Sequence, residues 1–152
     1  MARVLDTQAF LDTVCDLLRQ GEKSVAIPVA GGSMIPFLND GDTVLLEIPT
    51  TPLKRGDIVL YSRAGGRYIL HRIYRVDRNG GYIMVGDAQQ ELEYIPHRSQ
   101  IHARVTSVRH KGKLNKPDSF RWWFYRHIWM WLLPYRHRLM RLREKLRFRR
   151  RG

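Results

Sequence analysis

A short glycine-rich stretch, residues 31–42, holds the serine of this chain that is best presented for chemistry. Ser33 follows two glycines, and Pro36 comes three residues later. Glycine allows close approach to the backbone and unusual dihedral angles, and proline stiffens the chain behind it. A serine held in this way can be offered to a substrate with the neighbouring backbone N–H groups exposed. The plainer interpretation is a tight turn between two strands, and the stretch alone leaves both interpretations open.

The elements on either side of this stretch must position it. Residues 5–19 place apolar side chains on one side and aspartates elsewhere, which predicts an amphipathic helix. Asp6 or Thr7 is its expected cap, and Gly21 is its expected end. Short apolar runs separated by glycine turns predict strands at 25–29, 43–48, 58–62, 68–76, 82–85 and 101–110, with a loop at 91–96. The expected fold is therefore mainly β, antiparallel and closed or strongly coiled, with the N-terminal helix against its edge or mouth.

Composition limits the class of protein. A chain of 152 residues with 43% hydrophobic residues is long enough for one domain with a core. The single cysteine, Cys15, excludes an internal disulfide framework and a cysteine-based zinc site, and we interpret it as a packing residue. Acidic residues stand where a signal peptide needs an apolar region, so we expect no signal peptide. No apolar run reaches the length of a transmembrane helix.

The net charge of +13 lies mostly in the tail. Residues 116–152 contain 12 Lys or Arg against two acids, Asp118 and Glu144. They also contain all four tryptophans and nine of the 16 aromatic residues. We predict a helix over 119–133, capped by Asp118, and a second helix from Pro134 to about Phe148.

Three interpretations of this basic, aromatic tail remain open. An apolar face beside a dense arginine face is typical of a helix that binds an anionic membrane surface, and residues 120–151 have this pattern. Basic stripes with aromatic residues also bind nucleic acid, which we consider the less favoured partner. Alternatively, residues 119–133 simply pack against the β domain.

Four segments together resemble the signal peptidase I family of serine proteases and its relatives in the S24/S26-type superfamily. They are Ser33-Met34-Ile35-Pro36 followed by Gly41-Asp42, Lys54-Arg55-Gly56-Asp57-Ile58-Val59, Tyr68-Ile69-Leu70-His71-Arg72-Ile73, and Gly86-Asp87. Their order and spacing match that family over residues 25–110, and the tail lies outside the match. The resemblance implies a catalytic domain at 1–115, a separate tail at 116–152, and no cofactor or metal.

The resemblance also implies roles for individual residues. Ser33 is the nucleophile, and His71 stands where most bacterial members have a lysine base, so the chain resembles the Ser/His branch. An unperturbed histidine titrates at about 6.5 and is therefore available as a neutral base at pH 7. Asp87 is the candidate for the acid that orients His71, with Glu91 and Glu93 as alternatives. The oxyanion hole and apolar groove are assigned to the backbone at Ser33 and to Gly32, Met34, Ile35 and Phe37, although the last three suit a plain core equally well.

The expected function is a serine endopeptidase that cleaves a leader- or signal-type peptide. The rival is an inactive peptide-binding module of the same fold, tethered to anionic membrane. Self-cleaving repressors share the Ser-Met pattern, but residues 1–24 are too short for their helix-turn-helix domain. We expect a cytoplasmic protein held peripherally at the inner face of the membrane, of unspecified oligomeric state.

Overall fold

Helix α1 (Ala2–Arg19) buries only part of the apolar side that its sequence pattern predicts, since Phe10 and Leu17 are 45% and 38% exposed. The computed structural model describes the backbone of residues 2–149 and the side chains of residues 7–147. Val14, Cys15 and Leu18 are each at most 3% exposed, so Cys15 is a packing residue as expected. Gly21, with φ of +106°, ends the helix as predicted. The helix begins earlier than the predicted cap, and the Asp6 side chain lies outside the described residues.

Eight strands form one sheet in which every neighbouring pair is antiparallel. The sheet order is β1-β2-β7-β3-β4-β5-β6, with β8 paired to β7. Their bounds are β1 (Val25–Pro28), β2 (Thr43–Glu47), β3 (Ile58–Ser62), β4 (Tyr68–Val76), β5 (Tyr82–Val85), β6 (Glu93–Ile95), β7 (Ile101–His110) and β8 (Lys113–Asn115). The mainly β, antiparallel fold with an N-terminal helix is thus confirmed. Strand β6 corrects the predicted loop at 91–96, and β8 was not predicted.

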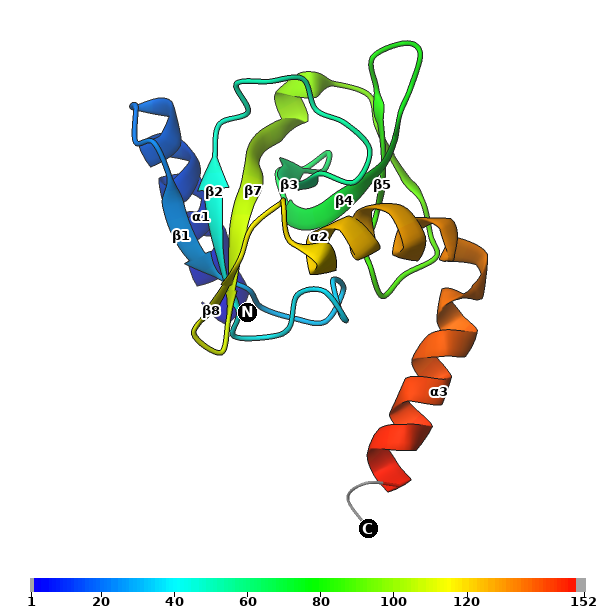
Figure 1. The fold of residues 1–152 in the computed structure, drawn as a ribbon. Helices are drawn as coiled ribbons and strands as arrows, with labels where there is room; N and C mark the ends of the chain where they lie inside the picture. Colours follow the sequence, from blue (N-terminus) through cyan, green and yellow to red (C-terminus); the bar gives the residue numbers. More distant parts are fainter. Residues whose placement is uncertain (1, 150–152) are drawn as a thin grey trace.

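The sheet coils because its ladders are interrupted by register shifts. Shifts occur between Leu45 and Leu46 in β2, between Leu60 and Tyr61 in β3, and between Ile73 and Arg75 in β4. Such irregularities increase local twist and bend the strands. Figure 1 shows the result, with α1 beside β1 at one end of the sheet and β4 and β5 curling away at the other.

Apolar side chains gather in two clusters because the coiled sheet encloses them separately. One cluster joins α1, the stretch that contains Met34 and Phe37, and the inner side of β2, β3 and β7. The other lies among β3, β4, β5 and β6 and includes Tyr61 and Tyr82. The candidate residues Ser33 and His71 come from segments that meet between these clusters.

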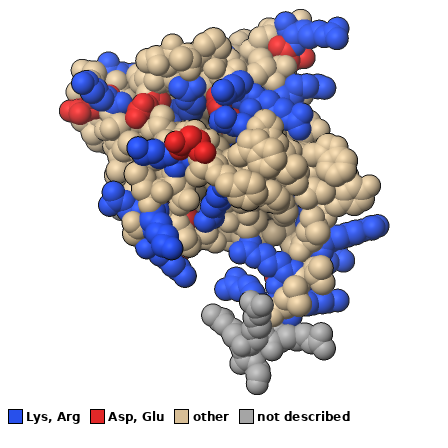
Figure 2. Space-filling model, in the orientation of Figure 1, with Lys and Arg blue, Asp and Glu red and all other residues tan. Residues whose placement is uncertain are grey.

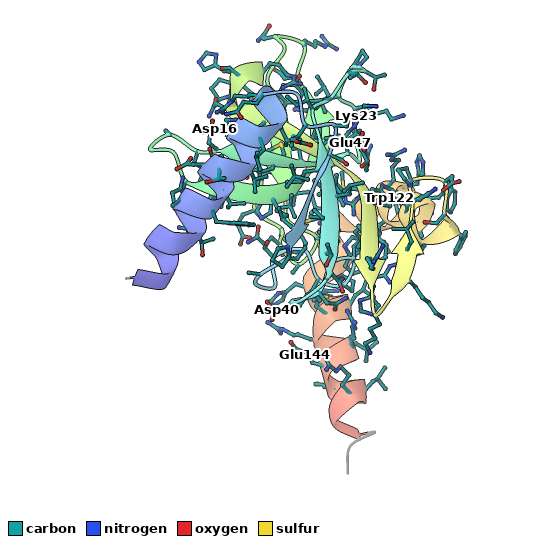
Figure 3. All side chains as sticks on the ribbon, turned by 90° about the vertical axis from the view of Figure 1, so that its left-hand side faces the viewer. Asp16, Lys23, Asp40, Glu47, Trp122 and Glu144 are labelled. Atoms are coloured by element: carbon teal, nitrogen blue, oxygen red, sulfur yellow. The ribbon has the colours of Figure 1, made fainter. Side chains whose placement is uncertain are left out.

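Residues 120–136, which we call the brace, pack against the sheet domain. Their elements are α2 (Phe120–Phe124), a π-helical turn η2 (Tyr125–Trp129) and a 3-10 turn η3 (Leu133–Tyr135). Trp122, Trp129, Met130 and Arg136 are at most 7% exposed. In Figure 3, Trp122 lies at α2, well away from α1. Packing therefore continues past the predicted domain boundary at residue 115, as one of the three interpretations of the tail expects.

Helix α3 (Arg136–Arg149) stands clear of the sheet (Figure 1). It begins two residues after Pro134, because the proline sits in the 3-10 turn that breaks the two helices apart. Residues 150 and 151, the end of the predicted membrane-binding segment, lie outside the described residues. No helix in the described part of the chain is long and apolar enough to cross a membrane.

Candidate active site

The nucleophile loop, residues 29–42, is closed at its base by backbone hydrogen bonds. Val29 N donates to Asp42 O at 2.7 Å, and Gly41 N donates to Val29 O at 2.9 Å. Further along, Gly31 N donates to the Asp40 carboxylate at 3.0 Å, in a backbone conformation with φ of +87° that favours glycine. These contacts tie the two ends of the loop that contains Ser33 to one another.

The loop that follows β5, residues 86–90, contacts the backbone of Ser33. Ala88 N donates to Ser33 O at 2.9 Å. A Cβ on Gly86 would lie 2.6 Å from the same carbonyl oxygen, which is closer than real contacts allow. Gly86 is therefore required for the two loops to approach this closely, and the backbone at Ser33 depends on the 86–90 loop.

Ser33 and His71 line the same groove, which has a volume of about 650 Å³. The groove runs between α1, the stretch 27–34 and β4, and its walls are mostly apolar. Met34 lines it, as expected. Phe37 does not, because its ring packs in the core against Trp122 at a centroid distance of 5.2 Å. Gly32 and Ile35 also lie outside the lining of the groove.

No hydrogen bond joins Ser33 to the His71 imidazole among the described side chains. Catalytic hydrogen bonds are often long without substrate and tighten only in the reacting complex. Shared lining of one groove is the relation that the structure gives these two residues.

His71 is a buried, neutral imidazole. It lies in β4 opposite Val59 of β3, and it is only 4% exposed. Burial disfavours the charged imidazolium and lowers the pKa of His71 to about 4, although the nearby Glu93 carboxylate acts in the opposite direction. The imidazole is therefore uncharged at pH 7 and free to accept a proton.

A tyrosine connects His71 to a carboxylate. The Tyr61 hydroxyl lies 3.3 Å from His71 Nδ1 and donates to Glu93 Oε2 at 2.6 Å. Burial raises the pKa of Tyr61, and the hydrogen bond to Glu93 raises it further, so the phenol stays protonated. Partial burial would raise the pKa of Glu93, but hydrogen bonds from Arg63 and Tyr61 outweigh burial and lower it. The anionic carboxylate can only accept, so the single Tyr61 proton points to it.

This arrangement fixes the tautomer of His71. The Tyr61 hydroxyl uses its single proton in the hydrogen bond to Glu93, so its oxygen can only accept from the histidine, and His71 carries its proton on Nδ1. Its Nε2 is left with a free lone pair. Arg63 donates to both Glu93 oxygens, to Oε1 at 2.6 Å and to Oε2, the oxygen that also accepts from Tyr61, at 2.8 Å. We call this the His71–Tyr61–Glu93 chain.

Asp87, the first candidate for the orienting acid, has a different partner. Both of its oxygens accept hydrogen bonds from Arg72, at 3.0 and 2.8 Å, and neither side chain is exposed. Arg72 also donates to Gly56 O at 2.9 Å. Among the described side chains Asp87 therefore makes no hydrogen bond to His71, because the buried guanidinium engages the whole carboxylate, and its role as the orienting acid stays a prediction. Glu91 lies exposed on the 86–93 connection, and Glu93 is the acid that the structure brings toward His71.

Sequence reasoning missed Tyr61 and Arg63, although a signal for Tyr61 was present. In the hairpin of β3 and β4, Val59 lies opposite His71, and Tyr61 is two residues further along the same strand. Residues two apart on a strand point to the same face, so the predicted hairpin already places Tyr61 beside His71. Arg63 lies beyond the end of the strand and carried no comparable signal.

The remaining histidines of the sheet make local contacts. His102 Nε2 lies 2.9 Å from Ser62 Oγ, and its ring packs edge-on against Tyr68. His110 Nδ1 lies 2.6 Å from the Asp42 carboxylate at the base of the nucleophile loop. Neither Ser62 nor His102 lines the groove that Ser33 and His71 share, although Tyr68 does.

Comparison with known proteins identifies the family. Residues 3–106 match the model of the peptidase S24-like family, which covers more than half of the chain. No curated protein matches the chain significantly in sequence. The matched family belongs to the same clan as signal peptidases, so the match supports the wider relationship that the four segments suggested. It does not show that the chain belongs to the signal peptidase I family. The coiled antiparallel sheet and the family match agree, and the chain belongs to the peptidase S24-like family, a family of serine peptidases.

Proposed function

We propose that this protein is a serine endopeptidase in which Ser33 attacks the substrate and neutral His71 is the base. The observation that carries the proposal is the His71–Tyr61–Glu93 chain, which leaves Nε2 of His71 unprotonated. His71 lines the same groove as Ser33. A neutral base at pH 7 is what activation of a serine hydroxyl requires.

The proposed reaction has two halves. Ser33 Oγ attacks the peptide carbonyl carbon while its proton passes to His71 Nε2. The resulting imidazolium then gives that proton to the leaving amine as the C–N bond breaks, which leaves an acyl ester on Ser33. Water attacks the ester with His71 again as the base, and the serine is restored. Glu93 stabilises the transient imidazolium through the Tyr61 hydroxyl, and Tyr61 and Glu93 are positioning residues.

The oxyanion would be stabilised by the backbone at Ser33. No acceptor within the described part of the chain takes the Ser33 N–H, so this donor remains available for the tetrahedral oxygen. The carbonyl of the same residue accepts a hydrogen bond from Ala88 N, which anchors the backbone on the C-terminal side of this donor. Such a preorganised donor needs no reorganisation when the charge develops.

The substrate class that we propose is an extended leader- or signal-type peptide. The groove offers mostly apolar walls from α1, the stretch 27–34 and β4, which suits the apolar segment of such a peptide. Resemblance of the four segments to signal peptidases is the other support for this substrate.

Acylation of the nucleophile tests the proposal and its rival, an inactive peptide-binding module. We expect a serine-directed acylating probe to add one label at Ser33, detected by intact mass and peptide mapping. Labelling should vanish in Ser33→Ala and fall strongly in His71→Gln. Ser62→Ala is the matched control, because Ser62 also lies at hydrogen-bond distance from a histidine but outside the groove. Absence of labelling in the wild-type protein, or labelling at Ser62, would reject the proposed mechanism.

A further inference from the structure

Helix α3 carries an apolar stripe that no other part of the described structure covers. Leu139, Leu142 and Leu146 are 37%, 55% and 53% exposed, and together with Arg143 and Arg147 they line a shallow groove along the helix. Spacings of three and four residues place the three leucines on one side of a helix. Figure 1 shows this helix projecting from the body, so the stripe faces the surroundings. We call these leucines the α3 stripe.

Basic residues flank the α3 stripe on both sides. At 3.6 residues per turn, Arg138 and Lys145 border one edge, and Arg143 and Arg147 border the other. Glu144 is the single acid among seven Lys or Arg residues from 136 to 149, and it lies on the opposite side of the helix. Figure 2 shows blue side chains crowding this end of the molecule, and Figure 3 labels Glu144 on the projecting helix.

The brace adds exposed aromatic rings next to α3 in the chain. Phe120, Trp123 and Trp131 are 75%, 48% and 71% exposed. Phe120 and Trp123 stack at a centroid distance of 5.8 Å, and Trp122 and Trp129 on the same segment are buried. Two tryptophans of the brace therefore pack against the sheet domain, and the other two, Trp123 and Trp131, are exposed. Large aromatic rings of this kind are enriched at the boundary between lipid and water.

Buried contacts of Arg136 anchor the start of α3 to the sheet domain and the brace. Arg136, the first residue of the helix, is fully buried and donates to Trp129 O at 3.0 Å and to Gly86 O at 3.1 Å. Burial lowers the pKa of Arg136 to about 10, so the side chain remains charged at pH 7. The start of α3 is thus anchored to the same loop that supports Ser33.

We propose that the α3 stripe and its basic flanks bind an anionic lipid surface. The leucines enter the boundary between headgroups and acyl chains, and the flanking guanidinium and ammonium groups contact lipid phosphates. A second copy of this chain is disfavoured because it would bring two strongly basic helices together. A nucleic acid would satisfy the charges but offers nothing apolar to the leucines. Because anionic lipids lie mainly in the cytoplasmic leaflet, the same proposal places the domain at the inner face of the membrane.

Vesicle binding by the full-length protein tests this proposal independently of peptidase activity. The probes are vesicles of phosphatidylcholine alone and of phosphatidylcholine mixed with phosphatidylglycerol, measured by co-sedimentation. We expect binding to the anionic vesicles only. Each basic side chain near such a surface contributes about fivefold to the partition coefficient, so Arg138→Gln/Arg143→Gln/Lys145→Gln should lose about a hundredfold.

The leucines separate lipid binding from simple attraction between charges. Leu139→Gln/Leu142→Gln/Leu146→Gln keeps every charge and should still lose about tenfold or more in partitioning. Lys23→Gln/Arg75→Gln/Arg78→Gln removes three exposed charges elsewhere and should lose far less than the α3 charge variant. Thermal unfolding and labelling of Ser33 should be unchanged in all three variants.

Three results would overturn the proposal. The first is a wild-type protein that does not sediment with anionic vesicles. The second is unchanged vesicle binding by the leucine variant. The third is binding to duplex DNA or RNA that exceeds vesicle binding at equal salt and is insensitive to the leucines, which would assign the helix to nucleic acid instead.

Discussion

Replacing Tyr61 by phenylalanine removes one oxygen from the centre of the His71–Tyr61–Glu93 chain. The ring is fully buried and keeps its packing in the cluster among β3, β4, β5 and β6. What disappears is the acceptor for His71 Nδ1–H and the donor to Glu93. The substitution therefore tests whether the carboxylate acts on the histidine through the tyrosine.

The expected loss is moderate because the carboxylate does not touch the imidazole. The contact between Tyr61 and His71 is 3.3 Å, longer than the usual N–H···O distance of about 2.9–3.0 Å, so it is weak in the resting enzyme. It strengthens when His71 becomes an imidazolium, since hydrogen bonds to charged groups contribute about 1.5–3 kcal/mol. A net loss of about 1–2 kcal/mol in the transition state corresponds to a roughly 5- to 30-fold fall in kcat. Removing a carboxylate that contacts its histidine directly costs about 10⁴-fold in a serine protease.

Steady-state kinetics on a peptide selected from a library provides the assay. KM should stay unchanged because Tyr61 does not line the groove, so the loss should fall on kcat. Glu93→Gln should lower kcat similarly, and the double variant should be no slower than the slower single variant, because both act through one chain. Tyr82→Phe, a buried tyrosine of the same cluster, is the matched control and should retain full activity.

Two outcomes would refute this reasoning. If Tyr61→Phe retained wild-type kcat, the hydroxyl would have no part in positioning the base. If the effects of Tyr61→Phe and Glu93→Gln simply added, the two residues would act independently, and the inferred tautomer of His71 would lose its support.

Three further predictions follow from the same geometry. Because the pKa of His71 is lowered to about 4, kcat/KM should fall only as pH drops toward 4, and a midpoint near 6.5 would contradict a buried base. Below pH 6.5 the histidine binds a proton more readily in the unfolded chain than in the folded one, so the free energy of unfolding should fall by up to roughly 3 kcal/mol between pH 6.5 and 4. Urea titration measures this loss, which His71→Gln should lack. Asp87→Asn should reduce the free energy of unfolding by about 3–5 kcal/mol because it leaves buried Arg72 without its counter-charge, whereas Glu93→Gln should cost much less; equal losses would mean that the Arg72–Asp87 pair has no structural role. Gly86→Ala should displace the Ser33 carbonyl and slow acylation by the probe at least tenfold. Gly65→Ala, at an open turn where a φ of +95° strains an alanine, should cost stability without slowing acylation. Normal acylation of Gly86→Ala would show that the two loops move apart without consequence.

The sequence was sufficient for most of the sheet because its strands are short and bounded by glycine turns. The predicted strands at 58–62, 68–76, 82–85 and 101–110 coincide with β3, β4, β5 and β7. Strand β6 was not predicted, because three residues are too few to show a periodicity and the strand forms by pairing with β5. That pairing matters for the site, since it places Glu93 opposite Met84 and within reach of Tyr61.

The acid of the candidate site was harder to predict than the base. Asp87 follows a motif-like glycine, and nothing local shows that Arg72, 15 residues earlier, binds both of its oxygens. An interaction of this kind depends on the neighbouring strands β4 and β5, which bring the two side chains together in a buried layer. Sequence patterns report periodicity along one segment. Which of Asp87, Glu91 and Glu93 lies near His71 depends instead on contacts between segments that are distant in the sequence.

The brace has a consequence for how this enzyme can change over evolution. Arg121 donates to the carbonyls of Pro36 and Phe37, Trp129 Nε1 donates to Asp87 O, and Arg136 donates to Gly86 O. The match to the family ends at residue 106, yet residues beyond it contact the backbone of both loops around Ser33. Recombination at the family boundary would therefore deliver a sheet with its loops unsupported. The brace and the two loops around Ser33 therefore form one structural unit, although only the loops lie within the residues that match the family.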